Sequence, residues 1–230
     1  MPCCYLLAPS NPLTPSELET ASKQPSSALL LPYLQNPNEF SVPLAKAPCR
    51  SPCTCCTATL LSITGVPSCR ARNAVLEATG KEYECCQGLC AGSFCIPSCR
   101  GSNVVGNCCE SVLCPTLSLS ITRALLMEER ELRPDPTDNQ IIRASNCLQL
   151  VSICCDCFAC LMTVTVGGDV GDAARLASNV VDVIACCAAL SVTGCMCVQV
   201  YEELEKGDVP VAKAVKVEEE GVKAAEKMER

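Results

Sequence analysis

Two long apolar segments in the C-terminal half of the chain constrain its fold more than any other feature. Residues 147–167 and 178–200 each have the length, about 20 residues, of a helix that crosses a bilayer. The apolar pattern around them predicts helices over 139–167 and 173–204. The short Gly-rich connector from Gly167 to Asp172 predicts an αα-hairpin, with Asp172 as the N-cap of the second helix.

One aspartate interrupts each apolar segment: Asp156 lies near the middle of the first, and Asp182 near the start of the second. A central Asp costs about 2.5–3.5 kcal/mol on the insertion scale, whereas Leu, Ile, Val and Phe each gain about 0.3–0.6 kcal/mol. Each segment has eight such apolar residues. In the first segment the gain from apolar residues therefore roughly equals the cost of Asp156. The second segment inserts more readily, because Asp182 lies near its start.

The basic residues are distributed unevenly around these segments. Eleven Lys and Arg residues precede the first segment, six follow the second, and only Arg175 lies between them. This distribution predicts a membrane hairpin with both termini in the cytosol. Asp156 and Asp182 would then face a shared interior and are the candidate pathway residues.

A soluble helical hairpin in the cytoplasm is the alternative. In that case Cys and Ala act as small packing residues, because free Cys is among the most buried residue types. Both aspartates would then face water.

The cysteine content limits the chemistry. The chain has 24 Cys and no His, which excludes Ser-His-Asp and Cys-His catalytic pairs and mixed Cys/His zinc sites. The first residues carry no basic region and no long apolar run, so we expect a reducing compartment in which stable disulfides are rare. Metal binding, S-acylation or burial must then account for most of the sulfur. An exported, disulfide-stapled protein is a third alternative.

A Cys-rich region at 49–116 contains an internal repeat with a period of 30 residues. Residues 55–75 and 85–105 share the pattern CC-x9-[VI]-P-S-C-R-x2-N-x-V. This predicts two copies of a small, largely irregular unit. In the first copy, Pro67 and Ser68 predict a turn, followed by a short helix from Arg70 to Thr79 that Gly80 closes.

The remaining segments complete a mainly α fold, in which the irregular Cys-rich repeat region is followed by the long apolar hairpin. Residues 1–48 hold nine of the 16 prolines and predict a disordered or extended arm, with Cys3 and Cys4 as lipidation candidates. The helical region spans 117–204 and begins with a helix over 117–133. A turn at 134–139 ends that helix and supplies the next N-cap. Residues 205–230 form a charged tail.

Thiolates are soft ligands for zinc and other soft divalent metals. The dense Cys pairs therefore predict metal binding, although two paired C-x2-C knuckles are absent from the sequence. The candidate ligands are Cys108, Cys109, Cys114, Cys55, Cys56, Cys69, Cys85, Cys86 and Cys99. We expect no enzymatic activity, because phosphate loops and metalloprotease motifs are missing. A net charge of −7 argues against nucleic-acid binding, and no small-molecule substrate is identified.

Two motifs resemble the Cys-rich placenta-specific-eight family, which includes plant cell-number regulators and cadmium-resistance proteins. Residues 108–116, CCESVLCPT, match the family pattern CC-x4-C-P-C except that Thr116 replaces the last Cys. Residues 197–204, CVQVYEEL, are similar to the family's C-terminal C-x-Q-x-Y-x-E-L. The resemblance implies a small, oligomeric protein of the plasma or an internal membrane, linked to divalent heavy-metal handling or growth control. The residues of this chain that match the family's metal-linked motif are Cys108, Cys109, Cys114 and Pro115.

Taken together, the residues predict a Cys-rich, membrane-associated protein that binds or helps to transport soft divalent metal ions. The alternative is a soluble cytosolic interaction protein with structural Cys4 zinc sites.

Overall fold

The computed structural model describes residues 5, 30, 33–34, 36–85 and 104–206. The predicted lipidation sites Cys3 and Cys4, the predicted ligands Cys86 and Cys99, and the tail from residue 207 lie outside the described residues. So does most of the second copy of the repeat.

The described fold is mainly α, as predicted. Its helices are α3 (Ala47–Arg50), α4 (Pro52–Leu61), α5 (Val66–Thr79), α6 (Val104–Leu113), α7 (Pro115–Arg130), α8 (Pro136–Thr165) and α9 (Gly168–Glu205). Two short 3-10 turns, η2 (Leu44–Lys46) and η3 (Ser62–Thr64), precede α3 and α5. Two-residue strands β1 (Asn38–Glu39) and β2 (Leu132–Arg133) pair in parallel.

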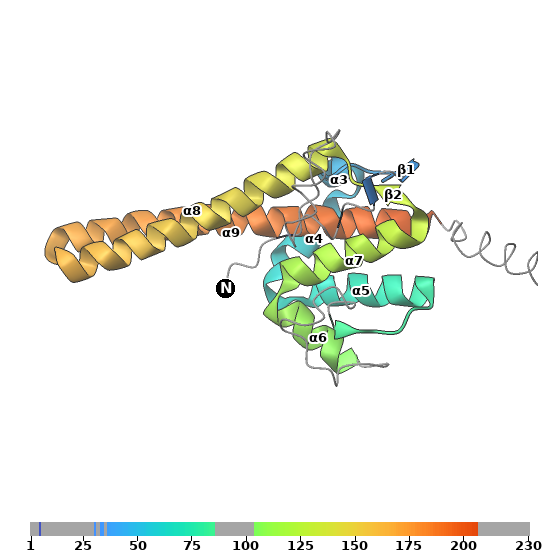
Figure 1. The fold of residues 1–230 in the computed structure, drawn as a ribbon, viewed down its shortest axis with the longest axis horizontal. Helices are drawn as coiled ribbons and strands as arrows, with labels where there is room; N and C mark the ends of the chain where they lie inside the picture. The colour runs from blue at the N-terminus through green and yellow to red at the C-terminus, as the bar shows by residue number, and fades with distance from the viewer. Residues whose placement is uncertain (1–4, 6–29, 31–32, 35, 86–103, 207–230) are drawn as a thin grey trace, which may run out of the picture.

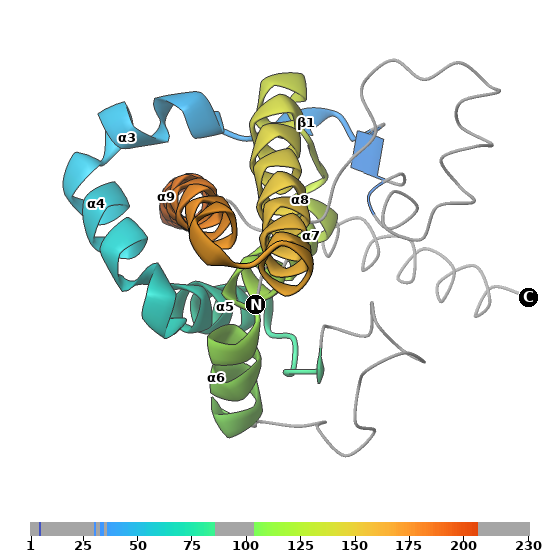
Figure 2. The ribbon, with the colours of Figure 1, turned by 90° about the vertical axis from the view of Figure 1, so that its left-hand side faces the viewer.

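The molecule consists of a helical body and a long hairpin that projects from it (Figure 1). α8 and α9 form the hairpin, and the second half of α9 continues into the body. There, α3, α4, α5, α7 and α8 are arranged around α9 (Figure 2). The main core cluster includes Leu119, Leu126 and Met196, all nearly inaccessible to solvent.

A buried polar network joins the root of the hairpin to the body. Arg123 on α7 donates from Nη2 to Asp138 Oδ2 on α8 over 2.6 Å. Gln199 Nε2 on α9 donates to the same carboxylate oxygen over 2.8 Å, and the backbone N–H of Leu44 donates to Oδ1 over 2.7 Å. Burial lowers the pKa of Arg123, and the charge of Asp138 opposes that shift. One carboxylate thus links three helices and the η2 turn.

Tyr5 is a second attachment at the root. Its backbone N–H donates to Asn146 Oδ1, and Asn146 Nδ2 donates back to the Tyr5 carbonyl, both over 2.9 Å. Its hydroxyl lies 2.5 Å from both Ala189 O and Thr193 Oγ1. Burial raises the pKa of Tyr5 above its ordinary value, so this hydroxyl remains protonated.

The close contact between α4 and α9 depends on a glycine. A Cβ built on Gly194 would lie 2.1 Å from Thr59 Oγ1 and 2.9 Å from the Cys55 carbonyl oxygen. Only a residue without a side chain allows the two backbones to approach this closely. Any larger residue at position 194 would push α4 away from the core.

Several predicted helix boundaries are wrong, and the reasons are local. α5 begins at Val66 rather than Arg70, because Pro67 is tolerated in the first turn of a helix. α7 ends at Arg130, before Pro134, because Glu131 adopts a left-handed conformation with φ of 50°. Asp135 supplies the predicted N-cap of α8 and accepts from Thr137 N over 2.6 Å.

The connector between the apolar helices is much shorter than predicted. α9 begins at Gly168, and Gly167 occupies the N-cap position with φ of 64°. Asp172 lies inside α9 and is not its N-cap. The positive φ values of Gly167 and Gly168 let the chain reverse within two residues.

Two further predictions need correction. The predicted arm up to residue 48 is ordered at its end, because Phe40, Val42 and Leu44 are buried against the body. The Cys-rich region, predicted to be largely irregular, is helical through most of its described part. Its Pro residues lie at helix starts, where they are tolerated.

Candidate functional site

The projecting part of the hairpin is apolar on its outside. Along α8 it runs from Cys147 to Thr165, about 29 Å at 1.5 Å per residue, and along α9 from Gly168 to Ala188, about 32 Å. Both helices are long and apolar enough to cross a membrane. Exposed large apolar side chains cover this surface: Leu150, Val151, Ile153, Phe158, Leu161, Val164, Val166, Val170, Leu176, Val180, Val183 and Ile184.

The inside of the hairpin, in contrast, is lined with small and polar residues. On α8, Ser145, Ser152 and Ala159 are buried at a spacing of seven residues. On α9, Gly171, Ser178 and Ala185 are buried at the same spacing. A Cβ on Gly171 would lie 3.0 Å from the Cα of Thr163. A seven-residue repeat of small side chains lets two helices pack closely along one seam.

The two predicted pathway residues are each paired across this seam. Ser152 Oγ on α8 donates to Asp182 Oδ1 on α9, and Ser178 Oγ on α9 donates to Asp156 Oδ1 on α8. The pattern is reciprocal, because each helix contributes one serine and, four residues later, one aspartate. Each carboxylate therefore has a hydroxyl donor from the opposite helix.

The two aspartates were predicted from their place in the apolar segments, whereas their serine partners were not. The signal was present as Ser-x3-Asp in both segments, Ser152 to Asp156 and Ser178 to Asp182. A spacing of four places both side chains on one helix face. In an antiparallel pair, two such faces bring each serine opposite the other helix's aspartate.

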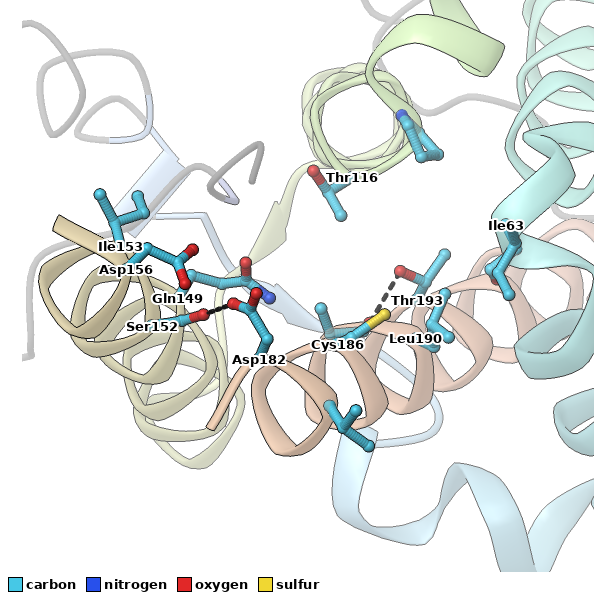
Figure 3. A pocket seen from close by; sticks show the side chains of 14 residues that line it. Ile63, Thr116, Gln149, Ser152, Ile153, Asp156, Asp182, Cys186, Leu190 and Thr193 are labelled. Carbon is cyan, nitrogen blue, oxygen red and sulfur yellow. Dashed lines mark hydrogen bonds between the residues drawn. The ribbon is translucent and has the colours of Figure 1, made fainter. Parts of the chain in front are cut away.

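A cavity of about 610 Å³ opens where the hairpin leaves the body (Figure 3). Asp156 and Asp182 both line it from the hairpin side, together with Gln149 and Cys186. Thr116 lines it from the body side. Gln149 Nε2 also donates to the Ala185 carbonyl across the hairpin over 2.9 Å. The structure thus brings both predicted aspartates to one cavity wall.

Two of the predicted metal ligands also come together, in the body. Cys69 Sγ on α5 lies 2.9 Å from Cys108 Sγ on α6. Burial, and to a lesser extent the contact with Cys108, raises the pKa of the Cys69 thiol to about 12. Asn73 Nδ2 lies 3.9 Å from the same sulfur. At neutral pH Cys69 is therefore a protonated thiol, which a metal ion would have to deprotonate.

The other predicted ligands in the described part of the chain do not join this pair. Cys55 lies 3.9 Å from Cys195, which is not among the predicted ligands. Cys56 and Cys109 are exposed, and Cys85 and Cys114 are half-buried. Within residues 36–85 and 104–206, no three Cys, Asp or Glu side chains form a group able to hold a metal ion.

A charge-placement experiment tests the Ser–Asp pairs. Ser152→Asp puts a second carboxylate opposite Asp182 and removes its hydroxyl donor. We expect the free energy of unfolding in detergent to fall by about 1–3 kcal/mol. Adding Asp182→Ser should restore most of the loss, because the pair is re-formed with its members exchanged. Equal stability of the single variant and the wild type, or no recovery in the double variant, would contradict the pairing.

Comparison with known proteins assigns the chain to no family. No family model matches it, and searches of curated proteins and of solved structures return no significant match. The resemblance to the placenta-specific-eight family therefore remains a prediction.

Proposed function

We propose that this protein is anchored in a membrane by insertion of the α8–α9 hairpin, with the helical body held at one membrane surface. One observation carries the proposal. Only 17% of the most apolar stretch of α8 and 33% of that of α9 is buried within the protein. The core helix of a soluble protein buries most of its apolar stretch, and these two leave theirs exposed. A bilayer supplies the missing apolar environment.

The length of the hairpin supports a span. Its projecting helices measure about 29 and 32 Å, and the hydrocarbon core of a bilayer is about 30 Å thick. Asp169, Asp172 and Arg175 lie in the first two turns of α9, near the connector. Arg175, the deepest of the three, lies seven residues or about 10 Å from the start of α9, so this charged end of the hairpin lies toward the far interface, which the long Arg175 side chain can reach.

The Ser–Asp pairs lower the cost of insertion. A carboxyl group in the hydrocarbon core is expensive when it faces lipid, and intramembrane aspartates accordingly face a helix interface or a cavity. Asp156 and Asp182 each accept a hydrogen bond at such an interface. The exposed apolar side chains remain for contact with lipid.

The distribution of Lys and Arg supports an orientation with the body and both termini in the cytosol and the connector on the opposite side. The cytoplasmic alternative needs a partner or a second copy of the chain to cover the apolar surface of the hairpin.

Glycosylation mapping tests this topology. The chain contains no Asn-x-Ser or Asn-x-Thr acceptor sequence. Any glycosylation therefore comes from the introduced acceptor. An Asn-Gly-Thr acceptor with flexible Gly/Ser flanks, inserted between Gly167 and Gly168, should be glycosylated when the protein is made with endoplasmic reticulum microsomes. The same insertion after Lys206 is the matched control and should remain unmodified. Modification only after Lys206 would contradict the orientation, and modification at neither site would contradict the span.

Soft-metal binding at Cys69 and Cys108 is a second candidate function, and the contact of their sulfur atoms supports it. These residues are 39 positions apart in sequence but adjacent on α5 and α6. Two thiolates are suitable donors for a soft ion such as Cd²⁺. A structural Cys4 zinc site has less support, because four thiols do not gather in residues 36–85 and 104–206.

Protection from alkylation tests the thiol pair one residue at a time. With increasing Cd²⁺, followed by iodoacetamide and peptide mass spectrometry, Cys69 and Cys108 should become protected together, before the exposed neighbour Cys109. Cys108→Ser should abolish the early protection of Cys69, because one of two ligands is lost. Protection should also require more Cd²⁺ as the pH falls, since binding displaces the Cys69 proton. Unchanged protection of Cys69 in Cys108→Ser would contradict a shared site.

A further inference from the structure

The body has an apolar surface of its own at the base of the hairpin. Four exposed residues form it: Leu60 and Ile63 at the α4–η3 corner, and Val112 and Leu113 at the end of α6. Three of them are highly exposed, Leu60 at 75%, Ile63 at 72% and Leu113 at 72%. We call this surface the shoulder. No Lys, Arg, Asp or Glu occurs in residues 51–69 or 111–122, the two stretches that contain these four residues.

The two halves of the shoulder are held together by a close backbone contact. Gly65, which follows η3, has φ of 71°, and a Cβ built on it would lie 2.3 Å from the Ser111 carbonyl oxygen and 2.7 Å from the Cα of Val112. The α4–η3 corner therefore abuts the end of α6. Any side chain at position 65 would separate them.

The shoulder lies at the level where the hairpin leaves the body. The cavity of about 610 Å³ at the base of the hairpin, here called the root cavity, is lined by Ile63 and by Leu190 and Thr193 of α9. Pro115, two positions after the shoulder residue Leu113, also lines it. Figure 3 shows Ile63 close to Leu190 and Thr193. In Figure 1, the corner between α4, α5 and α6 lies on the side of the body from which the hairpin projects.

Charged side chains gather at the opposite end of the body. Arg133 pairs with Glu39 at the β1–β2 strands, and Arg50 pairs with Glu202 near the end of α9. Lys81 pairs with Glu129 at the end of α7 over 2.6 Å. In Figure 1, β1, β2 and the end of α9 lie on the side away from the hairpin. The four shoulder residues are thus uncharged, whereas these three ion pairs lie at the other end of the body.

We propose that the shoulder docks into the interface of the bilayer that receives the hairpin, and so fixes the orientation of the body on the membrane. This inference rests on the proposed insertion of the hairpin. The occupant is lipid because Ile63 of the shoulder and the exposed hairpin residues Ile153 and Val183 border the same cavity, so the two apolar surfaces adjoin there. A hairpin inserted to the level of Ala189 brings the shoulder to the same lipid boundary. An interface of headgroups and first acyl carbons accepts exposed Leu, Ile and Val side chains.

Tryptophan fluorescence in proteoliposomes tests the docking, because the chain contains no Trp. Each of four variants carries a single Trp at an exposed position: Ile63→Trp and Leu113→Trp on the shoulder, Phe158→Trp in the middle of the hairpin, and Glu205→Trp at the charged end. The vesicles contain phosphatidylcholine with bromine at either a shallow or a deep acyl position. Bromine quenches only a Trp that touches it.

The two shoulder variants should show blue-shifted emission that shallow bromine quenches more than deep bromine. Phe158→Trp should be quenched most by deep bromine, and Glu205→Trp by neither. Quenching of Phe158→Trp without quenching of the shoulder variants would overturn the docking and leave the hairpin insertion intact. Absence of quenching at all four positions would overturn the insertion and the docking with it. Blue-shifted but unquenched shoulder variants would mean that protein covers the shoulder, which also overturns the proposal.

Discussion

The carboxylate of Asp138 connects the two parts of this molecule. It accepts hydrogen bonds from Arg123, Gln199 and the backbone of Leu44, so α7, α8, α9 and the η2 turn meet at one buried charge. A buried charge is tolerated only when its partners are in place. The network therefore fixes where the hairpin leaves the body. α9 can then belong to both parts: its first half packs on α8, and its second half lies in the center of the body.

This division places opposite kinds of surface on the two parts of α9. In the body, Met196, Val198 and Val200 are buried, as in a soluble protein. In the hairpin, the buried residues are small or polar, and the large apolar residues Val180, Val183 and Ile184 are exposed. Water penalises this second arrangement and lipid favours it. The small residues at seven-residue spacing let the two helices pack closely, and the reciprocal Ser–Asp pairs give each carboxylate a hydrogen bond. A hairpin in lipid requires both. The uncharged shoulder extends the same surface onto the body.

The sequence allowed the helical class, both long apolar helices and their hairpin to be predicted, because these depend on apolar spacing and length. The connector was predicted four residues too long, because the left-handed conformations of Gly167 and Gly168 cannot be read from composition. The contacts of Asp138 and of Cys69 with Cys108 depend on tertiary packing between distant segments, and spacing alone does not reveal them. The serine partners of Asp156 and Asp182 were predictable in principle from the repeated Ser-x3-Asp spacing. Their pairing follows only when the two helices are placed antiparallel and in register.

All of these proposals depend on the hairpin lying within a bilayer. Alkaline carbonate extraction of the tagged full-length protein from cell membranes, with a parallel sample treated with hydroxylamine, tests it most directly. The protein should stay in the membrane pellet under both treatments, because the apolar surface of α8 and α9 holds it without any lipid thioester. Release into the soluble fraction by carbonate alone would contradict the account. Release only after hydroxylamine would also contradict it, since the attachment would then come from a thioester-linked lipid and the hairpin would lie outside the bilayer.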